Sequence, residues 1–288
     1  MNFADYQAAA EITNIHDAPD PIAFLLLGIV GEAGVLSSDY KKHLRDRSSR
    51  ELFVRRAHEE LGDLLWYAST LATSLDLSLA EIAEDNLSKV RDRWGKSEAT
   101  TREILDANAP QAQSFPRSFE VEFSDDGSVV AITDAEGEPL GDIVDDNAHE
   151  DDGYRFHDVF HLANAAVLGW SPTARSLMKR KRKYEHEVDR VEDGARAIFT
   201  EEGIVAVMFR HAEQQKFYEG VRSVESELLS FIRIAVQGLE VERRPGSDWE
   251  SAILQGSEAF RSLKARGGGL VRCDLDNGTI AHVPPSAR

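Results

Sequence analysis

The chain has 288 residues, 42% of them hydrophobic and 29% charged, which is typical of a globular protein with a substantial core. Its formal net charge of −18 argues against a nucleic-acid backbone or an anionic membrane as the main partner. A small phosphorylated ligand stays compatible with this charge, since carboxylates can hold one through a divalent cation. The single cysteine, Cys273, excludes an intramolecular disulfide and a cysteine-rich zinc cluster, and indicates a reducing compartment.

The start of the chain lacks the features of a targeting sequence. Met1 is followed by NFADYQAAAEI, which has neither a basic start nor a long apolar run. The longest apolar stretch, IAFLLLGIVG at 22–31, is shorter than the roughly 20 residues that a membrane-spanning helix needs. The sequence therefore predicts a cytoplasmic protein.

Four helices are predicted in the first hundred residues. The first covers 2–15, and Asp20-Pro21 then supplies an N-cap and a proline at the first position of a helix that runs to residue 43. A third helix is expected over 50–75. Ser78 and Glu81 form a capping box for a fourth helix, which reaches residue 94. Short joints between helices of this length predict a four-helix bundle over residues 1–105.

The composition changes after this bundle. Residues 106–116, DANAPQAQSFP, are predicted to be a linker. Beyond it, Phe119, Val121 and Phe123 alternate with polar residues and lead into Asp126-Gly127, which predicts a β-hairpin within 117–146.

The rest of the chain returns to a helical pattern. Helices are expected between 151 and 265, followed by two short strands in LVRCDL and TIAHV, within 269–284. Residues 117–288 thus form an α+β extension of the bundle. The predicted fold class is mainly α, with a small antiparallel sheet in the C-terminal region.

Acidic side chains form a stripe on each of two neighbouring helices. Glu32 and Asp39 share a face of the second helix, and Glu60 and Asp63 share a face of the third, because positions three, four and seven apart lie on one side. Half-buried carboxylates are unfavourable unless a positive group lies between them. Hard oxygen ligands of this kind suit magnesium, which is usually shared with substrate phosphates.

The fourth helix carries a stripe of a different character. Asn86, Lys89 and Arg93 lie on one side of it. If this stripe faces the acidic pocket, Lys89 and Arg93 neutralise the outer oxygens of a bound phosphate. A solvated helix face is the plainer interpretation of each stripe taken alone.

Two segments together resemble a known family. GIVGEAGVLSSDYKKHL at 28–44, followed by EELGDLLWYASTLATSLDLSLAEIAEDNLSKVRDRW at 59–94, is similar to the MazG-type nucleoside triphosphate pyrophosphohydrolases of the all-α NTP pyrophosphatase superfamily. Their signature is E-x-x-E, a spacer, E-x-x-D, and a downstream helix resembling N-x-x-K-x-x-x-R. The resemblance covers residues 20–95 and matches motif, spacing and helix order together.

The resemblance implies roles for individual residues. Glu32 corresponds to the first metal ligand, and Glu60 and Asp63 to the second pair. The family's second glutamate falls at Val35, which cannot bind a cation, and Asp39 on the same stripe is the candidate substitute. Contacts with nucleotide or phosphate fall to the polar residues Lys42, Asn86 and Lys89.

The resemblance also implies a reaction. It is the hydrolysis of a nucleoside triphosphate to a nucleoside monophosphate and pyrophosphate, with Mg²⁺, or alternatively Mn²⁺, as the cofactor. Glu32 or Glu60 would orient or deprotonate the attacking water. A homodimer is expected, as in family bundles of this size. The alternative is a nucleotide-binding regulator in which Val35 has removed catalysis.

A second cluster lies at residues 147–170. His157, Asp158, His161 and Asn164 fall opposite an apolar arc, and two histidines four residues apart can share one cation. A later helix has an acidic side that includes Asp193 and Glu201. Hydrogen-bonded polar groups are one interpretation, and a separate metal hydrolase centre is the other. A loose likeness to the first bundle also suggests a degenerate second one with its helices permuted.

The only basic cluster is KRKRK at 179–183. It is expected to be either a solvated helix end or a contact for a phosphate or an acidic partner.

Overall fold

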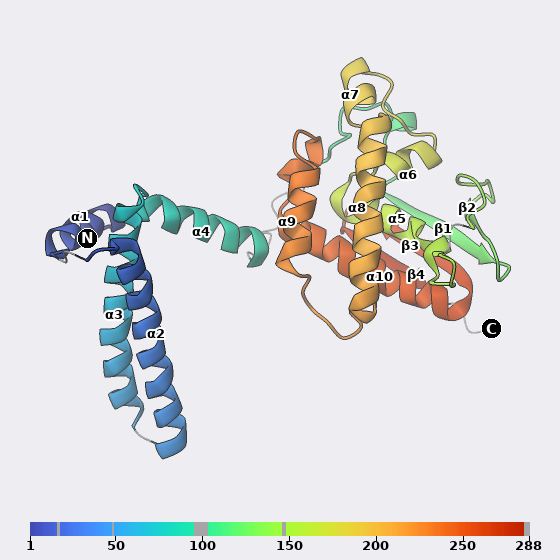
Figure 1. Ribbon diagram of the computed structural model, residues 1–288. Helices are drawn as coiled ribbons and strands as arrows, with labels where there is room; N and C mark the ends of the chain where they lie inside the picture. The colour runs from blue at the N-terminus through green and yellow to red at the C-terminus, as the bar shows by residue number, and fades with distance from the viewer. Residues whose placement is uncertain (16–17, 48, 95–102, 146–147, 285–288) are drawn as a thin grey trace. The chain divides into compact units, whose positions relative to one another are not determined.

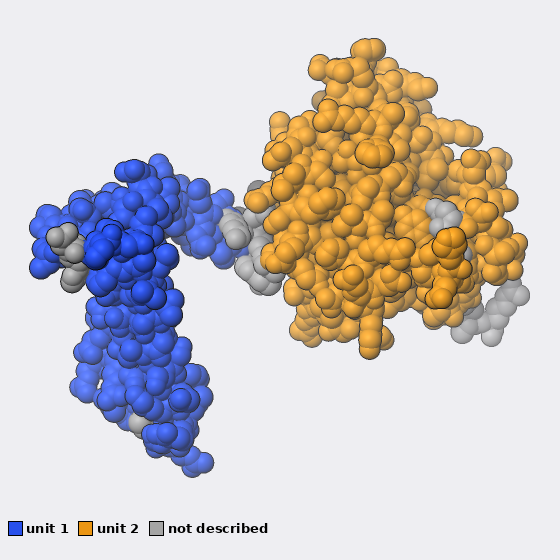
Figure 2. Space-filling view, in the orientation of Figure 1, with its two compact units in different colours: residues 1–91 blue, residues 92–288 orange. Residues whose placement is uncertain are grey.

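The computed structural model describes residues 1–15, 18–47, 49–94, 103–145 and 148–284. The chain divides into two compact units, residues 1–91 (unit 1) and 92–288 (unit 2), coloured separately in Figure 2. The described residues are mainly helical and include one four-stranded antiparallel sheet, which confirms the predicted fold class. The helices that begin in unit 1 are α1 (Phe3–Thr13), α2 (Pro21–Asp46), α3 (Arg50–Ser74) and α4 (Leu79–Trp94).

Unit 2 contains the remaining elements (Figure 1). Its helices are α5 (Asp158–Leu168), α6 (Pro172–Leu177), α7 (His186–Val191), α8 (Ala195–Gln214), α9 (Ser226–Ala235) and α10 (Gly246–Arg266). Its strands are β1 (Ser118–Asp125), β2 (Val130–Asp134), β3 (Gly268–Asp274) and β4 (Thr279–Val283). Short 3₁₀ turns lie at Gln111–Gln113, Tyr154–Phe156, Lys216–Tyr218 and Glu240–Arg243.

The helix ends of unit 1 follow from local chemistry. The side chain of Asp20 accepts a hydrogen bond from the N–H of Ala23 at the start of α2, and Ser49 caps α3 in the same way. The short connection between them lets α2 and α3 pack as an antiparallel hairpin (Figure 1). α1 packs against α3, where Gln7 donates a hydrogen bond to Thr73.

The fourth helix begins on this assembly and then departs from it. The backbone N–H of Leu79 donates to Gln7, which ties the start of α4 to α1. Beyond that first turn α4 runs away from the α2–α3 hairpin (Figure 1). Ile82, Leu87 and Val90, apolar residues that a closed bundle would bury, are each more than 40% exposed. All four predicted helices are present, but only α1, α2 and α3 pack closely together in one chain.

The close approach of α2 to α3 depends on Gly28. A Cβ atom there would collide with the aromatic ring of Tyr67, whereas Gly31 and Gly34 face open space. We expect Gly28→Val to destabilise unit 1 by about 1–3 kcal/mol, because overpacking forces neighbouring side chains and backbone to shift. Gly31→Ala is the matched control, expected to stabilise by roughly 0.5–1 kcal/mol through helix propensity alone. Urea denaturation of both variants measures the difference, and equal stabilities would contradict the packing.

The sheet of unit 2 joins strands that are far apart in the sequence. The order is β2-β1-β3-β4, with every neighbouring pair antiparallel. The predicted hairpin supplies β1 and β2, in which Phe123 pairs with Ile132. Strand β1 also pairs with β3 near the end of the chain, placing Val121 opposite Val271.

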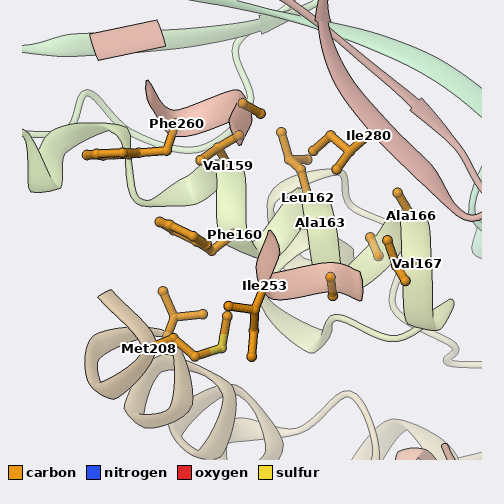
Figure 3. Packing of buried hydrophobic residues seen from close by; sticks show 14 of the residues in the cluster. Val159, Phe160, Leu162, Ala163, Ala166, Val167, Met208, Ile253, Phe260 and Ile280 are labelled. Carbon is orange, nitrogen blue, oxygen red and sulfur yellow. The ribbon is translucent and has the colours of Figure 1, made fainter. Parts of the chain in front are cut away.

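One helix of unit 2 is buried along its whole length. α5 packs against α10 and strands β3 and β4 on one side and against α8 on another, so every residue from Asp158 to Leu168 is buried. Figure 3 shows side chains of α5 together with Ile280 of β4, Met208 of α8 and Phe260 of α10. Polar residues on α5 are therefore held inside the protein. This arrangement of sheet and helices differs from a second four-helix bundle.

The predicted linker at 106–116 is part of unit 2. Asp106 is buried, and its carboxylate accepts hydrogen bonds from Arg175 at 2.7 Å and from the backbone of Phe115 at 2.8 Å. The guanidinium of Arg175 lies 4.0 Å from the centre of the Phe115 ring. Composition alone suggested a linker, because Arg175, the residue that compensates the charge of Asp106, comes much later in the sequence.

The basic cluster at 179–183 follows α6, and its two arginines are not the solvated helix end that was considered. Arg182 is buried, with its guanidinium bonded to Asp193 at 2.7 Å and to Glu240 at 2.5 Å. Arg180 donates hydrogen bonds to the backbone carbonyls of Gln111 and Ser114. Both arginines thus hold unit 2 together, whereas Lys179 and Lys183 are exposed.

Length and composition single out α2. Among the described residues it is the one helix long and apolar enough to cross a membrane by these two criteria. Only 6% of its most apolar 18-residue stretch is buried. The apolar run at 22–31 had suggested that no such segment exists. The same helix carries Glu32 and Asp39.

Candidate metal and nucleotide site

Three of the predicted metal ligands meet between α2 and α3. One carboxylate oxygen each from Glu32, Glu60 and Asp63 lies within 4.8 Å of the other two. Glu32 and Glu60 are half-buried, and Asp63 is exposed to solvent. The antiparallel hairpin therefore brings Glu32 of α2 to Glu60 and Asp63 of α3, although the sequence placed them on separate stripes.

This cluster is electrostatically unfavourable without a cation. The pKa of Glu60 is raised, first by lost hydration and then by the hydrogen bond and negative charge of Glu32, with the charge of Asp63 adding to it. Carboxylates that crowd one another in this way favour either a proton or a metal ion between them. The donor set consists only of oxygen atoms, which fits Mg²⁺ or Mn²⁺ better than softer metals.

Asp39 lies outside this group of three. Its carboxylate accepts hydrogen bonds from Lys42 at 3.0 Å and from Arg56 at 3.5 Å. These contacts lower the pKa of Asp39, with the Lys42 hydrogen bond as the largest cause. Two cations thus already compensate the residue expected to replace the missing family glutamate. Val35, at the position of that glutamate, is 44% exposed.

A hollow of about 130 Å³, open to solvent, begins at Asp39 and runs along the hairpin. Its lining combines positive, negative and aromatic side chains. These are Asp39, Lys42, Asp46, Leu52, Phe53 and Arg56. The ring of Phe53 stacks on His43 with centroids 5.4 Å apart. Positive groups that can bind phosphate oxygens and an aromatic surface that can stack on a base therefore line the same hollow.

Arg56 was not identified from the sequence. It precedes Glu60 and Asp63 by four and seven residues, the spacing that places it on the same face of α3 as these two acids. That spacing was a usable signal. The family motif itself contains only the acidic residues of this face.

The fourth helix does not bring Asn86 to this cluster. Asn86 is exposed on α4, which leaves the hairpin after its first turn. Lys89 and Arg93 also lie on α4, but their side chains are outside the described part of the structure.

A second group of potential metal ligands lies at the start of α5. One ligand atom each from His157, Asp158 and His161 falls within 4.8 Å of the other two, and all three residues are buried. The ring of His157 stacks on Tyr154 with centroids 4.4 Å apart. Its Nδ1 lies 3.0 Å from the backbone carbonyl oxygen of Tyr154.

Helix α8 presents two glutamates to His161. Nδ1 of the imidazole lies 3.1 Å from Glu201 Oε1, and Nε2 lies 3.4 Å from Glu202 Oε2. Burial lowers the pKa of His161, but the two carboxylates outweigh it, so the pKa ends well above 6.5. Glu201 is fixed by hydrogen bonds from Asn164 and from the backbone of Thr173. Glu202 was not identified from the sequence, although it directly follows Glu201.

Asp193, the other acid proposed for this second site, lies elsewhere. Its carboxylate is fully buried and bonded to the backbone N–H and the guanidinium of Arg182. Arg175 approaches it to 3.8 Å. Asp193 therefore compensates two buried arginines. Both of its carboxylate oxygens are engaged by Arg182, so Asp193 is not a ligand candidate for the histidine cluster.

The fold and these two clusters describe a mainly helical protein with a hairpin of acidic helices and an α+β C-terminal unit. Comparison with known families identifies the family: the model of the MazG C-terminal domain matches residues 100–286. The chain therefore belongs to the MazG family through that domain. A similar protein is the "Gene 37 protein" of Mycobacterium phage L5, 35% identical over 101 residues, which are 32% of this chain and 89% of the phage protein. No solved structure matches the chain.

Proposed function

We propose that unit 1 hydrolyses nucleoside triphosphates to nucleoside monophosphates and pyrophosphate with a bound divalent cation. The observation that carries the proposal is the convergence of Glu32, Glu60 and Asp63 within 4.8 Å on a hairpin that also bears the hollow containing Lys42 and Arg56. Membership of the MazG family supports a nucleotide pyrophosphatase-like activity. The carboxylate cluster and the two cations of the hollow together match the chemical needs of a triphosphate.

The residues of the hairpin can be assigned separate tasks. Lys42 and Arg56 bind phosphate oxygens, and Phe53 offers an aromatic face to the base. A bound magnesium ion would neutralise phosphate charge and make a water molecule more acidic. Glu60, with Glu32 as the alternative, accepts a proton from the water that attacks the α-phosphorus, while pyrophosphate leaves. A raised pKa makes Glu60 a stronger base than an ordinary glutamate.

The test is product analysis. Purified full-length protein is incubated with each ribo- and deoxyribonucleoside triphosphate in the presence of Mg²⁺ or Mn²⁺, and the products are separated by anion-exchange chromatography. We expect the monophosphate and pyrophosphate in equal amounts. Release of orthophosphate and a diphosphate would refute the proposed bond cleavage.

Binding without turnover is the second candidate, and one specific observation favours it. Val35 replaces the family glutamate one turn after Glu32, and its proposed substitute Asp39 is engaged by Lys42 and Arg56. Calorimetry with a non-hydrolysable triphosphate and Mg²⁺ distinguishes the two functions. Tight binding, together with no product over hours, would identify a nucleotide-binding regulator.

We also propose that unit 1 forms a homodimer. Leu26, Leu27, Val30 and Leu61 are each between 49% and 71% exposed on the hairpin, and Gly31 and Gly34 face open space. Apolar surface of this extent is typical of an interface, and the flat glycine positions permit close helix approach. A second copy could also bring Asn86, Lys89 and Arg93 of its α4 to the acidic cluster.

The dimer predicts a specific mutational result. Replacing Leu27 and Val30 with glutamate together should halve the mass measured by light scattering after size exclusion, because charges would be buried at the interface. Ile12→Glu, at an exposed site on α1, is the control and should leave the mass unchanged. A wild-type protein that is monomeric at micromolar concentration would contradict the proposal. Co-sedimentation with lipid vesicles would instead show that α2 meets a membrane.

A further inference from the structure

We infer that unit 2 holds a second metal site, selective for a transition-metal dication such as Zn²⁺ and built from His157, Asp158, His161 and Glu202. Its first three members already lie with ligand atoms within 4.8 Å of one another inside the protein. This site is distinct from the carboxylate cluster of unit 1 in both position and donor chemistry. It does not rest on the hydrolysis proposed above.

The tautomer of His157 suits metal binding. Its Nδ1 lies 3.0 Å from the carbonyl oxygen of Tyr154, and because a carbonyl only accepts, Nδ1 carries the proton of the neutral ring. Nε2 is then the nitrogen with the lone pair, and it lies 3.9 Å from Asp158 Oδ1. Metal-binding histidines commonly donate their other ring N–H to a backbone carbonyl in this way. Stacking on Tyr154 fixes the orientation of the ring.

His161 has the same two-sided environment, with a carboxylate in place of the carbonyl. Nδ1 faces the fully buried Glu201 at 3.1 Å, while Nε2 faces Glu202 at 3.4 Å. Glu201 is itself held by Asn164 and the backbone of Thr173, as a carboxylate that orients a metal-bound imidazole needs to be. His161 Nε2 and the Glu202 carboxylate are then the donors that point toward the metal.

A second observation independently indicates a missing partner. His161 is completely buried, and its Nε2, 3.4 Å from Glu202 Oε2, completes no hydrogen bond of regular geometry among the described residues. Asn164 Oδ1, also buried, has no hydrogen-bond partner among them either. Buried polar atoms are nearly always satisfied in native proteins, so a group of orphaned atoms beside three potential ligands points to an ion at this place.

The donor set selects the class of metal. Two imidazole nitrogens and two carboxylate oxygens suit Zn²⁺ or another first-row dication better than Mg²⁺, which prefers oxygen ligands and water. The Glu202 side chain is 40% exposed, so the ion can reach the site from solvent. Once bound, it would connect the start of α5 directly to α8.

The experiment uses the full chain carrying Glu32→Gln, Glu60→Gln and Asp63→Asn, which removes all three carboxylates of the unit 1 cluster. The protein is stripped with a chelator, dialysed, and titrated with Co²⁺, a spectroscopic substitute for Zn²⁺. We expect one equivalent to bind, with visible absorption typical of low-coordinate cobalt bound by nitrogen, and Zn²⁺ to displace it. Because the unit 1 ligands are absent, this result is independent of whether that unit hydrolyses nucleotides.

Substitutions assign the ligands. His161→Ala should abolish the cobalt absorption, and circular dichroism shows whether this buried variant still folds. Glu202→Gln, at a partly exposed position, keeps the fold and should weaken binding by about tenfold or more. Glu213→Gln, on the same helix α8, is the control and should leave the affinity unchanged. The inference is overturned if no metal binds, or if binding is the same in Glu202→Gln, His157→Gln and the parent. In that case His161 is simply an imidazolium shared by the two glutamates.

Discussion

Asp193→Ala should destabilise unit 2 by about 3–5 kcal/mol, the usual cost of removing one partner from a buried ion pair. The carboxylate is fully buried and accepts hydrogen bonds from the backbone of Arg182 at 2.6 Å and from its guanidinium at 2.7 Å. Burial disfavours the charge of Arg182, but Asp193 and Glu240 outweigh it and raise its pKa. Without Asp193, two buried arginines would keep a single acidic partner each, Asp106 for Arg175 and Glu240 for Arg182.

Urea denaturation followed by tryptophan fluorescence measures this loss, because Trp170 and Trp249 are both buried in unit 2. Asp193→Asn should lose less than Asp193→Ala, since an amide oxygen can still accept from the backbone of Arg182. Glu187→Ala, at an exposed position on α7, is the matched control and should stay within about 0.5 kcal/mol of the parent. A loss below about 1 kcal/mol in Asp193→Ala would show that the arginines are satisfied without this carboxylate.

Glu60→Gln should reduce the rate of triphosphate hydrolysis by about 10²–10⁴-fold, the range expected on loss of a general base. The same change should raise the melting temperature of the metal-free protein. The sign follows from the raised pKa of Glu60: an acid whose pKa is higher in the folded state is destabilising when ionised, so at pH 7 its charge works against folding. Removing the charge removes that penalty, while also removing a metal ligand.

Differential scanning fluorimetry with and without Mg²⁺ checks the second half of this prediction. The parent should gain thermal stability with added Mg²⁺, since a ligand that binds only the folded state stabilises it. Glu60→Gln should start higher and gain less. Glu59→Gln, at the exposed neighbouring position, should behave as the parent in both activity and melting. Activity lost equally in Glu59→Gln would indicate general charge effects and contradict a specific role for Glu60.

Sequence patterns predicted the helices of unit 1 well because their signals are local. Asp20-Pro21 and Ser49 each cap the helix that follows, and Ser78 accepts a hydrogen bond from Glu81 as the capping box requires. The departure of α4 from the hairpin could not be predicted, since it depends on whether apolar residues such as Leu87 find partners in the same chain. The assignment of 106–116 to a linker failed for a related reason: Asp106 finds Arg175 only in the folded unit.

The candidate site was predictable to the extent that it follows helical spacing. Glu32, Glu60 and Asp63 converge as expected from two helix stripes and a short connection. The environment of Asp39 was not predictable, because Arg56 reaches it across the hairpin from α3. In unit 2, the spacing of His157 and His161 indicated a shared ligand. That Glu201 faces this pair while Asp193 does not was not predictable, because it depends on how α8 packs against α5.

The pairing of β1 with β3 has a consequence for biosynthesis. Ser118 pairs with Asp274, so β1 cannot pair with β3 until residues 268–274 have left the ribosome. The helical hairpin at the amino end needs no such late arrival and can form while translation continues. Truncation anywhere before Gly268 should therefore yield a chain whose first region is folded and whose remainder is prone to aggregate.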